Sequence, residues 1–239
     1  MSFARHDGRN PDQLRPVIIT PHYLNHPAGS CLIEMGRTRV VCSAMVEESV
    51  PPFLKGGGKG WLTAEYSMLP ACSKQRVQRE RAKVGGRTHE IQRLIGRSLR
   101  SCIDTKLLGE RTIVVDCDVL DADGGTRTAS ITGAFVAVGL AMKRIQGSYP
   151  AAGACLKIAV AAISVGMVRG VACLDLNYEE DKNADVDMNV VKTSANQFVE
   201  VQGTAEGAPF DQAAMNDLLA LAGKGIQELF LAQQRILES

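Results

Sequence analysis

The stretch 112–145 constrains the fold most, because its pattern changes from strand to helix across two glycines. A mainly apolar run from Thr112 to Leu120 is followed by Gly124 and Gly125. Apolar residues then recur at spacings of four and three, which is the period of one helical face: Ile131, Phe135, Val138, Met142 and Ile145. The stretch therefore predicts a buried strand, a glycine turn and the beginning of a long helix.

This junction is a candidate anion site. The first turn of a helix offers free backbone N–H groups and the positive end of the helix dipole. Gly125 would permit a close approach of the backbone, Thr126 follows it, and Arg127 adds a planar fork that matches phosphate oxygens. The alternative is that the glycines and threonine serve only as a turn and a cap, and the pattern alone leaves both interpretations open.

Positive charge is concentrated in residues 74–100. The chain has a net charge of +1, whereas this segment carries nine basic and two acidic residues, so the segment is +7 and the rest is −6. Such asymmetry favours a polyanionic partner at one face over an ordinary solvated surface. We expect an exposed loop or irregular helix over 73–86 and a helix over 88–105, on which Arg93, Arg97 and Arg100 line one stripe. Arg87 directly precedes that helix, where an anion would be favoured.

Five carboxylates fall within residues 179–187. Asp187 stands between Val186 and Met188 in an apolar strand, where an unpartnered carboxylate is costly. Dense carboxylates at such a junction are typical of Mg²⁺ sites, which need one or two carboxylates besides water and phosphate. We therefore single out Asp181 and Asp187. The alternative, acidic residues that solvate a turn, accounts for Glu180 and its neighbours but not for Asp187.

The remaining segments predict one α+β domain over 1–239 with an internal pseudo-duplication. Two β-hairpins are expected, over 29–46 and over 157–178 with a turn at Gly166, and a last helix is expected after Asp211 as its cap. The two halves repeat the same order of features, namely a hairpin with an acidic end, a strand and a long helix. No linker separates them.

Composition predicts a cytoplasmic protein. The seven cysteines are odd in number and scattered, without a C-x-x-C pair, which is typical of buried thiols in a reducing compartment. The charged N-terminal residues do not form a secretory signal. We expect no apolar run of the ~18 residues that would span a bilayer, and hence no membrane partner.

Six segments together resemble the ribonuclease PH family over nearly the whole chain. They are Gly60–Pro70, Gly86–Arg100, Asp123–Phe135, Leu174–Asp181, Asp187–Val191 and Glu200–Gly207. The resemblance implies an α+β fold made of a duplicated β-α unit like domain 2 of ribosomal protein S5, and a ring-shaped homohexamer built as a trimer of dimers. One departure is Ala71, which follows Pro70 where family members usually carry an arginine.

The resemblance also assigns roles to residues. It implies phosphate binding by Arg87, Gly125, Thr126 and Arg127, and catalytic, metal-binding roles for Asp181 and Asp187. It places RNA contacts at Arg76 and Arg79, to which the basic stripe adds Arg93 and Arg97.

The activity that it implies is phosphorolytic 3′-to-5′ trimming of tRNA precursors and other RNAs, including rRNA, with release of nucleoside 5′-diphosphates. The reaction would be reversible, with inorganic phosphate as co-substrate and Mg²⁺ or Mn²⁺ as cofactor. Three alternatives stay open: a subunit of an exosome-like ring or fragment of a polynucleotide phosphorylase, a silent RNA-binding scaffold, and a small-molecule kinase of related fold.

Overall fold

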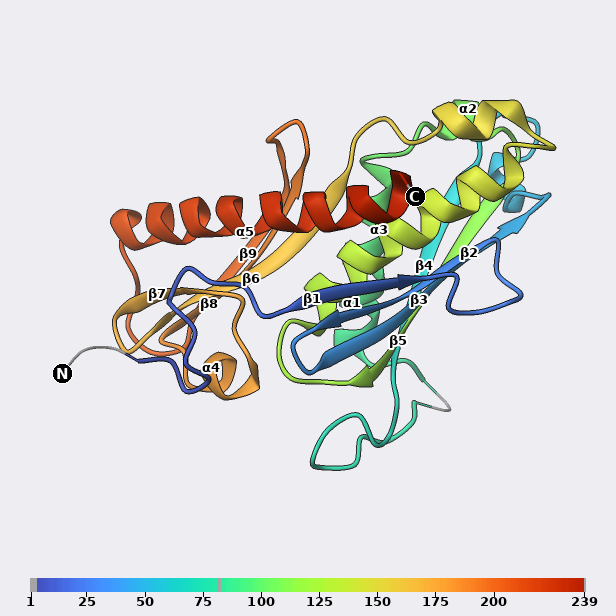
Figure 1. Ribbon diagram of the computed structural model, residues 1–239. Coiled ribbons are helices and arrows are strands. Elements are labelled where there is room, and N and C mark those ends of the chain that lie inside the picture. The colour runs from blue at the N-terminus through green and yellow to red at the C-terminus, as the bar shows by residue number, and fades with distance from the viewer. Residues whose placement is uncertain (1–3, 81–82, 239) are drawn as a thin grey trace.

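The computed structural model describes residues 4–80 and 83–238, which form two β-sheets and five α-helices (Figure 1). The first sheet has the strand order β1-β2-β3-β5-β4. Its strands are Val17–Pro21 (β1), Gly29–Met35 (β2), Thr38–Glu47 (β3), Trp61–Met68 (β4) and Thr112–Asp121 (β5). Only β4 and β5 are parallel, because the chain crosses over between them through helix α1 (Gly86–Arg100) and the short α2 (Thr105–Leu108).

The second sheet is antiparallel, with the order β7-β6-β8-β9. Its strands are Val160–Val168 (β6), Val171–Leu174 (β7), Val186–Thr193 (β8) and Phe198–Ala205 (β9). The short helix α4 (Tyr178–Lys182) lies between β7 and β8, and the long helix α5 (Gln212–Glu238) packs on β6 and β7. Two 3₁₀ turns, Pro52–Leu54 (η1) and Pro150–Ala154 (η2), complete the described elements.

Helix α3 (Thr126–Ile145) is the core of the molecule. It packs on β2 and β3 of the first sheet and on β6 of the second, so residues 128–142 are all buried. The predicted single apolar face was therefore too narrow, because a helix enclosed on all sides buries its whole circumference.

From the sequence we expected no apolar run long enough to span a bilayer, and helix α3 is an exception to that expectation. By length and composition, α3 is the one helix in the described part of the chain apolar enough to cross a membrane. However, 83% of its apolar window is buried inside the protein. Its hydrophobicity is explained by its place between the two sheets.

The hairpin of β2 and β3 confirms the first predicted hairpin, whereas the second differs from its prediction. Its turn is at Arg169 and Gly170, both with positive φ, and Gly166 lies inside β6 opposite Cys173. Gly166 is a glycine because a Cβ there would lie 2.5 Å from the carbonyl oxygen of Val186. The predicted turn at Gly166 is thus wrong.

Helix boundaries also shifted. Helix α1 ends at Arg100 instead of Thr105, because the chain turns at Ser101 and Asp104 caps α2 by accepting from the Lys106 and Leu107 N–H groups. The predicted cap of the last helix is confirmed, since the Asp211 carboxylate accepts from the Ala214 N–H at 2.9 Å. All seven cysteines are free and buried.

Candidate active site

The glycine turn has the conformation that the sequence predicted. Gly124 and Gly125 have φ angles of 77° and 66°, in the left-handed region. Gly125 is the N-cap of α3 and no side chain caps this helix. A Cβ at Gly124 would lie 2.5 Å from the carbonyl oxygen of Leu176. The turn therefore packs directly on the backbone that precedes α4, and it leaves the helix N-terminus without a side-chain acceptor.

Arg127, in the first turn of α3, is held from β9. Its Nη1 donates to Gln202 Oε1 at 2.9 Å, and Gln202 Nε2 donates to Glu90 Oε1 at 2.7 Å. Arg87 lies within the first turn of α1, rather than before the helix as predicted, because α1 begins at Gly86. The two arginines thus come from the N-terminal turns of two different helices.

Tyr66 on β4 lies within electrostatic range of both arginines. Its hydroxyl is 2.9 Å from the hydroxyl of Thr126. Burial raises the pKa of Tyr66, while the Thr126 hydrogen bond and the charges of Arg87 and Arg127 act in the opposite direction. Sequence reasoning did not identify Tyr66, Gln202 or Glu90 as site residues.

Asp181 and Asp187 lie near each other and within electrostatic range of both arginines. Asp181 is on α4, and Asp187 is on β8 opposite Gly166. Burial and then the charge of Asp187 raise the pKa of Asp181, and the charges of Arg127, Arg87 and Arg15 oppose the rise. The structure therefore brings the predicted aspartates and arginines into one electrostatic neighbourhood.

The two aspartates fit a hard divalent cation. The described part of the chain has no group of three or more His, Cys, Asp or Glu side chains that could form a complete cage. Mg²⁺, however, is usually held by one or two carboxylates together with water and substrate phosphates. Desolvation is the larger cause of the raised pKa of Asp181 and the charge of Asp187 adds to it, and a cation shared by the two carboxylates would relieve that repulsion.

The expected RNA-binding arginines lie on two consecutive segments, the loop after β4 and helix α1. Arg76 and Arg79 are exposed in the loop between β4 and α1, whose described parts extend away from the body of the molecule (Figure 1). Arg93 is exposed, and Arg97 pairs with Glu200 on β9 at 2.7 Å. No helix forms in the described residues of this loop, and Arg81 lies outside the described residues.

The predicted basic stripe on α1 is shorter than expected. Arg100 Nη1 donates to the Leu62 carbonyl at 2.9 Å, and its guanidinium lies 5.0 Å from the centroid of the Trp61 ring. Arg100 is thus engaged in packing α1 on β4, and only Arg93 and Arg97 of the stripe remain at the surface.

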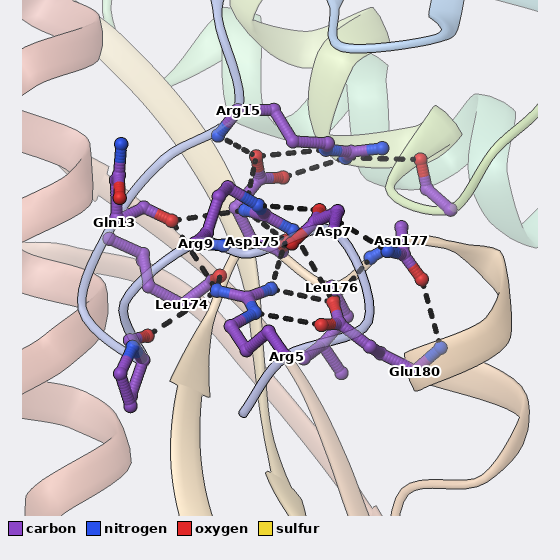
Figure 2. A network of polar contacts seen from close by, with 12 residues as sticks. Arg5, Asp7, Arg9, Gln13, Arg15, Leu174, Asp175, Leu176, Asn177 and Glu180 are labelled. Carbon is purple, nitrogen blue, oxygen red and sulfur yellow. Dashed lines mark hydrogen bonds and ion pairs between the residues drawn. The ribbon is translucent and has the colours of Figure 1, made fainter. Parts of the chain in front are cut away.

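The acidic turn proved to be a short helix with a buried anchor. Asn177 caps α4 in a capping box with Glu180. Glu180 is only 5% exposed, and it accepts two hydrogen bonds from Arg5 at 2.7 and 2.6 Å (Figure 2). The interpretation of Glu180 as a solvated residue was wrong, because a carboxylate that solvates a turn has no buried partner.

Comparison with known proteins gives full-length matches. The sequence model of the 3′ exoribonuclease family matches as domain 1 over residues 13–143 and as domain 2 over residues 159–225. The chain is 57% identical to ribonuclease PH of Syntrophomonas wolfei over 237 residues, covering 98% of this chain and 99% of that protein. It is 55% identical to ribonuclease PH of Bacillus subtilis over 236 residues, covering 98% and 96%.

Solved structures show the same fold. The rice (Oryza sativa) protein Rrp46 superposes with a TM-score of 0.78 at 19% identity, covering 98% of this chain and 100% of that one. A chain of the Archaeoglobus fulgidus exosome, solved with RNA bound to the active site, gives a TM-score of 0.77 at 21% identity, covering 95% and 92%. These likenesses confirm the predicted α+β fold class.

Proposed function

The chain belongs to the 3′ exoribonuclease family, and we propose that the cluster of Arg87, Arg127, Asp181 and Asp187 is its active site. The activity is phosphorolytic 3′-to-5′ removal of nucleotides from tRNA. One observation carries the assignment of the site: two arginines and an uncapped helix N-terminus gather beside two closely spaced carboxylates. That arrangement suits the two anions, inorganic phosphate and the RNA phosphodiester, that phosphorolysis must bring together.

Inorganic phosphate would bind at the N-terminus of α3. The backbone N–H groups after Gly125, the Thr126 hydroxyl and the Arg127 fork supply donors from one side, and Arg87 supplies positive charge from α1. In the structure, Nη1 of Arg127 donates to the side-chain oxygen of Gln202. A neutral amide is a weak competitor for a guanidinium, so phosphate would readily displace it.

The reaction is a displacement at phosphorus. An oxygen of inorganic phosphate attacks the last phosphodiester, the bond to the 3′-oxygen of the preceding nucleotide breaks, and that oxygen takes up a proton. The terminal nucleotide leaves as a nucleoside 5′-diphosphate. Because two anions must approach each other, positioning and positive charge supply most of the rate enhancement. The products retain a phosphoanhydride bond, so the enzyme would also add nucleotides from diphosphates.

Asp181 and Asp187 would hold a divalent cation, Mg²⁺ or Mn²⁺. When bound, such an ion supplies charge neutralisation at the scissile phosphate and the leaving 3′-oxygen. Helix α4 carries Asp181 and strand β8 carries Asp187, and the two carboxylates are near enough to interact electrostatically.

RNA would enter across the basic surface. Arg76 and Arg79 in the exposed loop and Arg93 on α1 offer phosphate contacts, which position a strand without reading its sequence. This suits an enzyme that trims the 3′ ends of tRNA precursors and of other RNAs, including rRNA.

The assembly and location follow the family resemblance. We propose a cytoplasmic homohexamer, a trimer of dimers, in which the loop around Ala71 contributes to contacts between subunits. Sedimentation of the purified chain tests this proposal. A species of six subunits supports it, and a stable monomer that needs a different subunit for activity contradicts it.

The assignment of the site is tested by substituting Arg127. Wild type, Arg127→Ala and Arg127→Lys are incubated with 3′-extended tRNA, Mg²⁺ and increasing phosphate, and nucleoside diphosphates are measured. We expect Arg127→Ala to lose about a hundredfold or more in rate. Arg127→Lys should recover little of the lost rate, because lysine lacks the planar fork of arginine. Unchanged phosphorolysis by Arg127→Ala would overturn the assignment.

A further inference from the structure

A buried ion pair joins the glycine turn to the chain that leads into α4. Arg15 and Asp175 have side chains only 4% and 1% exposed, and they pair through both carboxylate oxygens (Figure 2). Arg15 Nε donates to Oδ2 at 2.9 Å and Nη2 donates to Oδ1 at 2.7 Å. The Arg15 backbone N–H donates to Oδ2 as well, at 2.9 Å.

The other side of the Arg15 guanidinium holds the turn. Nη1 donates to the carbonyl oxygen of Asp123 at 2.5 Å, and Nη2 lies 3.4 Å from that of Gly124. Thr38 adds a hydroxyl that donates to the Gly124 carbonyl at 2.6 Å. The three carbonyl and carboxylate partners of Arg15 thus belong to two separate segments, 123–124 and Asp175.

Asp175 is itself fixed in an unusual backbone conformation. Its φ is 54°, which ends β7 and turns the chain toward the α4 cap. Its N–H donates to the Ser164 carbonyl at 2.8 Å, and the next residue, Leu176, donates from its N–H to the Ser164 hydroxyl at 3.2 Å. Gly124 packs against the carbonyl of that same Leu176.

We infer that Arg15 is a positioning residue for phosphate: it holds the 123–125 turn against Asp175 and so aims the donors at the start of α3 toward α4. A turn with two left-handed residues has no regular backbone ladder of its own, so its orientation depends on what binds its carbonyls. The Arg15 fork is rigid and planar, and it binds both segments at once. This inference rests on the proposed phosphate site.

The test measures phosphate affinity without RNA, by titration calorimetry, together with the phosphate KM and kcat of phosphorolysis. Arg15→Lys keeps the charge but loses the fork. Arg15→Met combined with Asp175→Asn removes both charges, so neither is left buried and alone, and asparagine tolerates the left-handed backbone. The matched control is Arg5→Met combined with Glu180→Gln, which removes a similarly buried pair whose Arg5 donates to the Asp175 carbonyl at 3.0 Å but does not hold the 123–125 turn.

We expect both Arg15 variants to weaken phosphate binding about tenfold or more, since a displacement of about 1 Å in a positioned group can cost a hundredfold. The phosphate KM should rise more than kcat falls, and the control should bind phosphate like wild type. Arg15 variants with wild-type phosphate affinity would overturn the inference. An equal loss in the Arg5 control would also overturn it, because the effect would then be general destabilisation.

Arg127→Ala separates failure of this inference from failure of the proposed site. If Arg127→Ala loses phosphate binding while the Arg15 variants keep it, the site stands and the positioning role is wrong. If Arg127→Ala binds phosphate as wild type does, the phosphate lies elsewhere and both proposals fail.

Discussion

The hydroxyl of Tyr66 lies 2.9 Å from the hydroxyl of Thr126, which joins β4 of the first sheet to the first turn of α3. Removing this hydrogen bond by Tyr66→Phe should cost about 1 kcal/mol in the free energy of unfolding. It should also raise the phosphate KM, because Thr126 loses the partner that orients it. Urea unfolding and phosphate-dependent kinetics measure the two effects, and a variant with wild-type values of both would contradict this role.

Asp181→Asn should make the metal-free protein more stable at neutral pH while abolishing activity. Burial and Asp187 raise the pKa of Asp181 in the folded state. A carboxyl with a raised pKa stabilises the fold only while it is protonated, and that contribution is lost as pH rises through its folded-state pKa. Asp181 is exposed to solvent, which screens the repulsion, so the gain in stability from asparagine at neutral pH should be small.

Thermal unfolding without and with Mg²⁺ measures this prediction, with the exposed Asp185→Asn as control. Mg²⁺ should raise the Tm of wild type and of the control but not of Asp181→Asn. A Tm of metal-free Asp181→Asn at or below that of wild type would contradict the repulsion that the account assigns to this pair.

Arg5→Met should destabilise the fold by about 3–5 kcal/mol, because it leaves the Glu180 carboxylate buried without its partner. Denaturant unfolding gives the free energy. The solvent-exposed pair of Lys224 and Asp12 is the control, and Lys224→Met should change stability little. Similar losses of unfolding free energy in Arg5→Met and Lys224→Met would mean that burial does not determine how much the Arg5–Glu180 pair stabilises the fold.

Arg76→Ala combined with Arg79→Ala should weaken RNA binding and flatten its salt dependence. Each phosphate contact to single-stranded RNA contributes about 0.7 to the slope of log K against log salt. Lys106→Ala is the control, since this residue is exposed and its helix α2 lies at the other end of the molecule from the loop in Figure 1. An unchanged slope in the double variant would show that the loop does not contact RNA phosphates.

Local patterns predicted the centre of the site. The strand, glycine turn and helix at 112–145 depend on neighbouring residues only, and they formed as expected. The residues that contact that turn could not be predicted from local sequence, because they come from distant parts of the chain. Tyr66 meets Thr126 because β4 pairs with β5 across a crossover, and Gln202 reaches Arg127 from β9.

The same limit explains the errors. Glu180 looked like a solvating residue because its buried partner, Arg5, is 175 positions away. Gly166 looked like a turn residue because glycines are common in turns, yet it is required inside β6 by the close approach of Val186. Arg15 carried no local signal, since its role depends on two segments more than a hundred residues further along the chain.

The most direct test of the account follows the phosphorus atom of the attacking group. Purified protein is incubated with unlabelled 3′-extended tRNA, Mg²⁺ and radiolabelled inorganic phosphate, and the released nucleotides are separated. We predict label in nucleoside diphosphates with wild type and almost none with Arg127→Ala. Unlabelled nucleoside monophosphates, released at the same rate without phosphate, would contradict it, because the attacking group would then be water.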